Sequence, residues 1–283
     1  MTQPHGTPFV RGTSPAPPRR PVRIAVQLHP QHAPYPRLRA AVREAEALGV
    51  DAIFGWDHFF PLYGPPNGQH FECWTTLAAW AEQTSEVLIG PMVSCVAFRN
   101  PHLLADMART VDHVAGGRLI LGVGAGWSEQ DFTEFGYPFK SPGALIDDLA
   151  AALPVIRDRL HGPDRSPVGR VPLMIGGAGE RKTLRLVAEY ADIWHSFSVE
   201  SELAHRTAVL RGHCEQIGRD INDIEVAVAV GGGERNWRAP GAPQRWGEPL
   251  RQAGADMFTL AVGGAAYDLT EVQAWLDWRD TAR

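Results

Sequence analysis

Cysteine is scarce in this sequence, and long apolar runs are missing from it. The chain of 283 residues contains three cysteines, Cys73, Cys95 and Cys214, and no two of them form a CxxC pair. This odd and scattered set argues against a disulfide framework and against a cysteine-rich zinc site. No stretch approaches the roughly 18 to 20 apolar residues that span a bilayer. We therefore expect a cytoplasmic protein that is not embedded in a membrane.

Positive charge is also in short supply. Lys and Arg together number 27, against 32 for Asp and Glu, which gives a net charge of −5 without long blocks of like charge. The basic surface that nucleic-acid binding requires is therefore not expected. We predict a small molecule as the partner, rather than nucleic acid or a membrane.

The beginning of the chain differs in composition from the rest. Residues 1–21 hold six prolines and no apolar run, so they match neither a signal peptide nor a packed element. Over the whole chain 44% of residues are hydrophobic and 21% are charged, which is ordinary globular usage. We expect a disordered, proline-rich tail over 1–21 and one folded domain over 22–283.

The folded part alternates between short apolar runs and amphipathic stretches with helical spacing. Strands are expected at 22–27, 51–56, 87–93, 118–123, 171–175, 192–197, 224–230 and 256–261. Helices are expected at 35–48, 72–84, 101–114, 142–160, 180–190, 200–217, 246–253 and 268–278. Two helix starts carry strong signals, because Asn100 and Ser141 each place a capping side chain before a proline at the first helical position.

Eight strand–helix units over about 250 residues predict a single-domain (β/α)8 barrel, the TIM barrel. The competing fold is a doubly wound sheet, which needs a GxGxxG fingerprint in its first strand–helix turn. Here Gly122, Gly124 and Gly126 are spaced GxGxG in the fourth unit, and Trp127 stands where the last glycine belongs. The fingerprint fails, and the barrel is the better prediction.

In such barrels the active site lies at the carboxyl ends of the strands. The run Trp56-Asp57-His58 follows the second strand and contains the side chains best suited to acid–base chemistry. A neutral imidazole can donate or accept a proton near pH 7, and a neighbouring carboxylate can fix its tautomer. The alternative is that Asp57 caps a loop and that His58 is a rim histidine without a chemical role.

Glycines follow several of the strands. Gly176, Gly177 and Gly179 precede a predicted helix and offer backbone N–H groups and a positive helix end to a phosphate, with Arg181 and Lys182 nearby. The alternative is a tight turn that needs positive φ. Residues 231–234 and 263–264 form a second-ranked phosphate position.

Five segments together resemble the luciferase-like flavin and deazaflavin enzymes, most closely the coenzyme F420-dependent oxidoreductase branch. They are VQLHPQ at 26–31, WDH at 56–58, TTLAAWAEQT at 75–84, the segment 99–127 that contains RNP and GGRLILGVGAGW, and the segment 175–194 that begins with IGG. The resemblance covers nearly the whole chain from Val22 onward, and the combination is far more specific than any one motif.

The resemblance implies a barrel that holds a tricyclic ring at the carboxyl ends of its strands, usually in a homodimer. Asp57 and His58 match the family's Asp-His pair beside the ring, and its cis non-proline peptide bond falls on Met92–Val93. The implied cofactor-binding residues are Trp56, Asp57, His58, Met92, Val93, Ser94, Gly124, Ala125, Gly126, Gly176, Gly177, Ala178 and Gly179.

Two positions depart from the family pattern. The glutamate that sugar-phosphate dehydrogenase members carry just after the fourth-strand glycines is Trp127 here, which counts against a sugar phosphate as substrate. The segment between the helix at 142–160 and the strand at 171–175 is much shorter than in many relatives. We therefore expect no substrate-covering insertion and an open pocket.

The expected function is hydride transfer between coenzyme F420 and a small organic substrate, with a flavin or F420 reductase system as electron source. His58 is the expected proton donor, and Asp57, Glu72 and His195 are the other catalytic candidates. The main alternative is a reduced-FMN monooxygenase that uses oxygen. A metal-dependent lyase with His58, Asp57 and Glu72 as ligands is disfavoured because no HxH or HxxE pattern follows a strand, and a non-catalytic flavin carrier is a further alternative.

Overall fold

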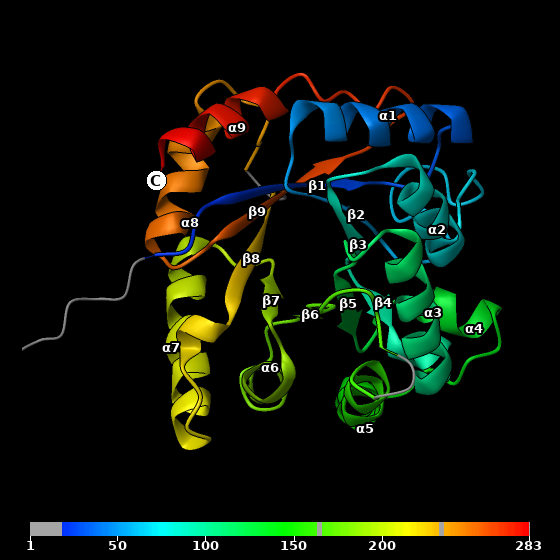
Figure 1. The fold of residues 1–283 in the computed structure, drawn as a ribbon, viewed down its shortest axis with the longest axis vertical. Coiled ribbons are helices and arrows are strands. Elements are labelled where there is room, and N and C mark those ends of the chain that lie inside the picture. The colour runs from blue at the N-terminus through cyan, green and yellow to red at the C-terminus, as the bar shows by residue number, and fades with distance from the viewer. Residues whose placement is uncertain (1–18, 163–165, 232–234, 283) are drawn as a thin grey trace, which may run out of the picture.

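The computed structural model describes residues 19–162, 166–231 and 235–282 (Figure 1). The predicted disordered tail therefore lies mostly outside the described residues, which begin at Arg19. Arg19 and Arg20, the first two described residues, donate hydrogen bonds to the carbonyl oxygens of Arg251 and Asn222. Of the expected short connection between the helix at 142–160 and the strand at 171–175, residues 163–165 fall outside the described residues. Residues 232–234 of the second-ranked phosphate position also fall outside them, whereas Gly263 and Gly264 are described.

Parallel strands form the centre of the molecule. They are β1 (Arg23–Leu28), β2 (Ala52–Gly55), β3 (Leu88–Pro91), β4 (Ser94–Cys95), β5 (Leu121–Gly124), β6 (Leu173–Gly176), β7 (Ile193–Ser196), β8 (Glu225–Val230) and β9 (Met257–Val262). Every pairing is parallel among the described strands, in the order β3-β2-β1-β9-β8-β7-β6-β5-β4. This is the sheet of a (β/α)8 barrel.

Where one strand was predicted at 87–93, the structure has β3 at Leu88–Pro91 and a second short strand, β4, at Ser94–Cys95, beyond the predicted end. β3 pairs with β2, and β4 pairs with β5, so the two pieces together occupy the third place in the barrel. Ile89 pairs with Leu119, and the Ile120 N–H donates to the Ile89 carbonyl at 2.8 Å, which joins the two edges of the sheet. The break falls at Met92–Val93, and this peptide bond is cis, as the family resemblance implied.

Helices surround the strands as an outer ring (Figure 1). They are α1 (Tyr35–Leu48), α2 (Cys73–Gln83), α3 (Pro101–Val114), α4 (Glu129–Glu134), α5 (Pro142–Leu160), α6 (Thr183–Tyr190), α7 (Glu200–Gln216), α8 (Glu248–Gln252) and α9 (Val272–Thr281). α1, α3 and α5 have the predicted bounds, whereas α4 was not predicted. A π-helical turn at Pro243–Gly247 precedes α8, where a single helix was expected. Among the described residues, no helix is long and apolar enough to cross a bilayer.

Alternation along the strands divides the core into two layers. In β1, Ile24 and Val26 face the helices, while Ala25 belongs to a separate cluster that fills the barrel interior. That inner cluster contains Ala25, Ala52, Phe54, Met92, Ile120, Met174, Ile193, Ala227 and Met257. The barrel is therefore a packed core rather than a pore, and a ligand can only be seated above this layer.

Two glycines allow the divided strand to approach its neighbour. A Cβ on Gly122 would lie 2.1 Å from the Pro91 carbonyl oxygen, and a Cβ on Gly90 would lie 2.1 Å from the Ile120 carbonyl oxygen. Both contacts are with backbone, which cannot move aside as a flexible side chain can. Glycine at position 122 is thus needed for the close packing of these strands.

We expect Gly122→Ala to lower the free energy of unfolding by about 1–3 kcal/mol, because the added methyl overpacks the backbone of the third strand. Gly212→Ala is the matched control, since Gly212 lies inside α7 with nothing within 4 Å of a Cβ. That control should stabilise the protein by roughly 0.5–1 kcal/mol through helix propensity. Urea unfolding of both variants measures this, and equal stability of Gly122→Ala and the wild type would refute the packing argument.

Candidate functional site

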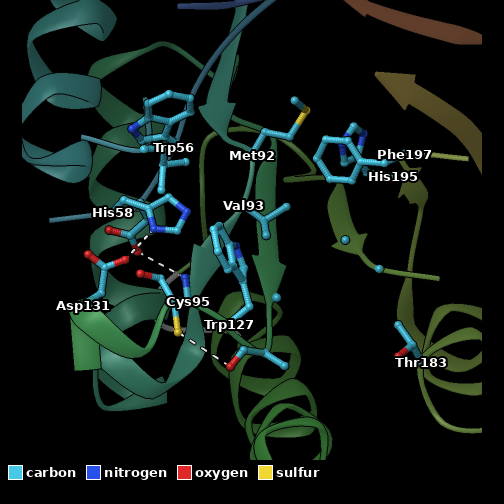
Figure 2. Close-up of a pocket in the computed structure, with 18 of the residues that line it drawn as sticks. Trp56, His58, Met92, Val93, Cys95, Trp127, Asp131, Thr183, His195 and Phe197 are labelled. Atoms are coloured by element: carbon cyan, nitrogen blue, oxygen red, sulfur yellow. Dashed lines mark hydrogen bonds and ion pairs between the residues drawn. The ribbon is translucent and has the colours of Figure 1, made fainter. Parts of the chain in front are cut away.

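A cavity of about 460 Å³ lies at the carboxyl ends of the strands (Figure 2). The residues that line it follow the ends of six barrel strands and the start of α5 and α6. They are Gln27, Trp56, Asp57, His58, Leu62, Tyr63, Met92, Val93, Cys95, Phe98, Gly124, Ala125, Gly126, Trp127, Ser128, Asp131, Pro142, Ile146, Gly176, Gly177, Ala178, Gly179, Thr183, His195 and Phe197. This is the end of the barrel where the sequence placed the active site.

The structure brings most of the predicted site residues together in this cavity. Every predicted cofactor-binding residue except Ser94 lines it, and so do the catalytic candidates Asp57, His58 and His195. Glu72 does not line it. Ser94 lies beneath the cavity wall and donates a hydrogen bond to Asp57 at 2.7 Å. The roles assigned to these residues stay predictions, but their placement is now defined.

The imidazole of His58 is held by a carboxylate that was not among the predicted residues. His58 Nδ1 lies 2.5 Å from Asp131 Oδ2, and the other oxygen of Asp131 accepts the Phe59 N–H at 2.9 Å. Because an ionised carboxylate only accepts, Nδ1 carries the hydrogen in this bond. Nε2 of His58 is therefore the ring nitrogen left for a ligand in the cavity (Figure 2).

Asp131 is ionised in spite of its position. Its side chain is 1% exposed, and burial alone would favour the neutral acid. The hydrogen bonds from His58 and from the Phe59 N–H outweigh burial, so the pKa of Asp131 is lowered from its usual value. The hydrogen bond to this negative charge fixes the orientation of the His58 ring.

Asp57 has a different set of partners from the one that its sequence position suggested. Its carboxylate is bound by Arg99 through two nitrogens at 2.5 and 3.0 Å, and it also accepts the Cys95 N–H at 3.2 Å. Ser94 donates to the same carboxylate and accepts from Trp74 Nε1 at 3.0 Å. Asp57 thus ties the end of β2 to β4 instead of bonding to the neighbouring His58.

Glu72 is the N-cap of α2. Its carboxylate accepts the N–H groups of Trp74 and Thr75, and Arg99 donates to it at 2.9 Å. These backbone hydrogen bonds and Arg99 outweigh the effect of burial, so the pKa of Glu72 is lowered. Glu72, which was predicted as a catalytic candidate, therefore caps α2 and does not line the cavity. Among the described residues, no three His, Cys, Asp or Glu side chains converge as metal ligands, so the metal-dependent alternative has no ligand set here.

His195 lies on the opposite side of the cavity from His58, at β7 (Figure 2). The residue is 1% exposed, and neither of its ring nitrogens has a hydrogen-bond partner among the described residues. Burial lowers the pKa of His195 to about 4, so the ring is neutral at pH 7. A buried polar group without a partner is costly, and a bound ligand in the cavity would satisfy it.

The indole of Trp56 is also fixed from behind. Trp56 Nε1 donates to His70 Nε2 at 3.0 Å, and the His29 ring lies 4.3 Å from the indole. Burial lowers the pKa of both His29 and His70 to about 4, which leaves His70 Nε2 free to accept this bond. Trp56 therefore presents a rigid apolar wall.

Val93 defines the floor of the cavity and explains two of the glycines. A Cβ on Gly124 would lie 2.7 Å from Val93 Cγ2, and one on Gly176 would lie 3.0 Å from Val93 Cγ1. Gln27 donates to the carbonyl oxygen of Met92 at 3.0 Å and supports the same segment. Close packing against Val93 therefore explains glycine at positions 124 and 176, whereas Gly177 has the positive φ of the tight-turn alternative.

The loop at 176–179 has the geometry of a tight turn that leads into α6. Gly177 has a φ of +131°, and Trp194 Nε1 donates to its carbonyl at 2.7 Å. No described side chain caps the first turn of α6, and Thr183 in that turn lines the cavity. Lys182 instead pairs with Asp147. The phosphate position predicted here therefore has backbone and hydroxyl groups and lacks the expected lysine.

Several lining residues were missed from the sequence, namely Asp131, Thr183, Phe197, Tyr63 and Phe98. Asp131 lies in the short helix α4, and 73 residues separate it from His58. Six residues are too few to show a helical period, so the sequence offered no local signal for it. Tyr63 and Phe197 follow β2 and β7 and were within reach of the rule that active-site residues follow strands.

The comparisons with known proteins agree with this architecture. The sequence pattern of the luciferase-like monooxygenase family matches residues 20–231. The chain is 24% identical over 215 residues to an uncharacterized protein of Mycobacterium tuberculosis, and the aligned region covers 71% of this chain and 72% of that protein. It is 29% identical over 182 residues to a putative coenzyme F420-dependent oxidoreductase of the same organism, which covers 54% of this chain and 48% of that protein.

Solved structures share the fold. An F420-dependent secondary alcohol dehydrogenase superposes with a TM-score of 0.78 at 17% identity, covering 93% of this chain and 99% of that chain. A monooxygenase from Streptomyces bottropensis superposes with a TM-score of 0.66 at 15% identity, covering 90% and 97%.

The family match covers more than half of the chain and supports an oxidoreductase with the barrel fold. The protein belongs to the luciferase-like monooxygenase family. The predictions of this family, of the (β/α)8 barrel and of an oxidoreductase are confirmed.

Proposed function

We propose that this protein transfers a hydride between coenzyme F420 and a small organic substrate in the cavity at the barrel mouth. The observation that carries the proposal is the His58–Asp131 pair, which places an oriented imidazole at the wall of a largely apolar cavity. The putative F420-dependent oxidoreductase of Mycobacterium tuberculosis supports the choice of cofactor. F420 supplies a ring carbon that accepts or releases a hydride.

Three features of the cavity suit a deazaflavin. Trp56, Met92 and Val93 offer apolar surface to a planar ring. His195 offers two unpaired, buried ring nitrogens to the polar edge of that ring or of the substrate. The loop at 176–179 and the uncapped start of α6 offer backbone N–H groups to a phosphate.

The phosphate position relies on backbone groups rather than on cationic side chains. No Lys or Arg lines the cavity among the described residues, and the nearby Lys182 pairs with Asp147. The start of α6 would supply about half a positive charge to a bound phosphate, and it does so for either cofactor.

The chain contributes orientation and a proton path. His58 Nε2 exchanges a proton with the substrate oxygen, and the ionised Asp131 stabilises the ring while it holds that proton. Trp56 and Val93 exclude water from the two sides of the reacting centre. Asp57 keeps the floor in place through Ser94 and Cys95.

The alternative function is that of an FMN-dependent monooxygenase, and structural similarity to the Streptomyces bottropensis enzyme concerns the fold alone. A homodimer, a cytoplasmic location and a flavin or F420 reductase as electron source follow from the family resemblance and belong to the same proposal.

Titration of the purified protein with each cofactor tests this proposal. We expect F420 to bind at least about tenfold more tightly than FMN, because the relative that supports the choice of cofactor is F420-dependent. Oxidation of reduced F420 by an organic substrate should proceed equally under air and under nitrogen. Tighter binding of FMN together with oxygen-dependent turnover would establish the monooxygenase instead, and cofactor binding without turnover would indicate a carrier.

We expect His58→Ala to reduce turnover at least about tenfold, because the substrate oxygen loses its proton partner. The affinity for F420 should change little, since the ring rests on Trp56, Met92 and Val93. His102→Ala removes an exposed histidine of α3 that lies outside the cavity and serves as the control. Steady-state kinetics decides the matter, and unchanged turnover in His58→Ala would remove this residue from the mechanism.

A further inference from the structure

Three large side chains at the cavity mouth are unusually exposed. We call Tyr63, Trp127 and Phe197 the aromatic rim; they are 63%, 67% and 70% exposed, and all three line the cavity. They follow three different strands, β2, β5 and β7, so their convergence is a property of the fold and not of one loop. Exposed apolar groups gathered around a pocket mark a surface that binds apolar ligands.

The rim aromatics lie next to the two cavity histidines. Trp127 meets the His58 ring edge-on with centroids 5.4 Å apart, and Phe197 meets the His195 ring in the same way at 4.9 Å. Figure 2 shows these two pairs on opposite sides of the cavity. Each imidazole is therefore a polar group that lies next to an exposed aromatic side chain.

Arg99, Lys182 and Asp131, three charged residues at or near the cavity, are paired within the protein. Arg99 is held by Asp57 and Glu72, and no Lys, Arg or Glu lines the cavity among the described residues. Apart from Asp57, the carboxylate among the described lining residues is that of Asp131, which is buried and bound to His58. An anionic substrate would meet no Lys or Arg among the described lining residues, and burying its charge unpaired would be costly.

We propose that the substrate is an uncharged, largely apolar ring compound that carries one carbonyl or hydroxyl group. This inference rests on the proposed function, because it concerns the same cavity. The aromatic rim holds the apolar ring, and the polar group reaches His58 Nε2. In the reductive direction, bound reduced F420 would supply a hydride to the substrate carbon, and His58 protonated at Nε2 would supply the proton to the oxygen. The proton that F420 loses on oxidation would leave to solvent, from which His58 would regain its own, so the products would be the alcohol and oxidised F420; the reverse reaction would oxidise the alcohol.

Two probes of nearly the same shape test the charge requirement. 4-Methylacetophenone is neutral, and 4-acetylbenzoate differs from it by a carboxylate in place of the methyl group. Calorimetric titration into the protein loaded with oxidised F420 should show at least about tenfold tighter binding of the neutral probe. Equal or tighter binding of 4-acetylbenzoate overturns the proposal, and so does failure of both probes to bind.

Substitutions test whether the rim is responsible. Trp127→Ala and Phe197→Ala should each weaken binding of 4-methylacetophenone about fivefold or more, with little change in F420 affinity. Leu103→Ala is the control, since this large apolar residue of α3 is 53% exposed and lies outside the cavity lining. Equal effects of the control and the rim variants would overturn the assignment.

The same titrations without cofactor separate this inference from the proposed function. The rim belongs to the chain itself, so the preference for the neutral probe should persist in the cofactor-free protein. If F420 fails to bind while that preference holds, the proposed function is wrong and the apolar-ligand site stands. If F420 binds and the preference is absent, the proposed function stands and this inference is wrong.

Discussion

The hydrogen bond between His58 and Asp131 is the constraint on which the site depends. Asp131 is buried, and a buried carboxylate without partners costs several kcal/mol, so α4 and the loop after β2 are fixed to each other through this bond. The bond also orients the imidazole, because Nδ1 is engaged and Nε2 is directed to the ligand. The position of His58 beside the apolar cavity therefore results from the contact between α4 and the loop after β2.

A second carboxylate near the cavity, that of Asp57, has a structural role. Asp57 precedes His58 in sequence, yet it bonds to Ser94, Cys95 and Arg99 and holds the divided third strand of the barrel. Asp57 and His58 are adjacent in the loop after β2, yet their side chains bond to different segments, β4 and Arg99 for Asp57 and α4 for His58. One carboxylate stabilises the floor, and the other, from a distant helix, stabilises the imidazole.

The sequence was most informative where local signals were strong. The helices at 35–48, 101–114 and 142–160 have their predicted bounds, since prolines and the capping residues Asn100 and Ser141 mark their starts. The break in the strand at 87–93 was expected only from the family resemblance. Asp131 and the pairing of Asp57 with Arg99 could not be predicted, because both depend on contacts between segments that are far apart in sequence.

The protonation pattern of His58 tests the central claim most directly. Nitrogen-15 NMR of histidine-labelled protein, at a pH where the ring is neutral, reports which ring nitrogen carries the hydrogen. The account predicts the hydrogen on Nδ1, bonded to Asp131, with Nε2 bare and available in the cavity. A hydrogen on Nε2, or the rapidly averaged mixture of a free imidazole, would contradict it.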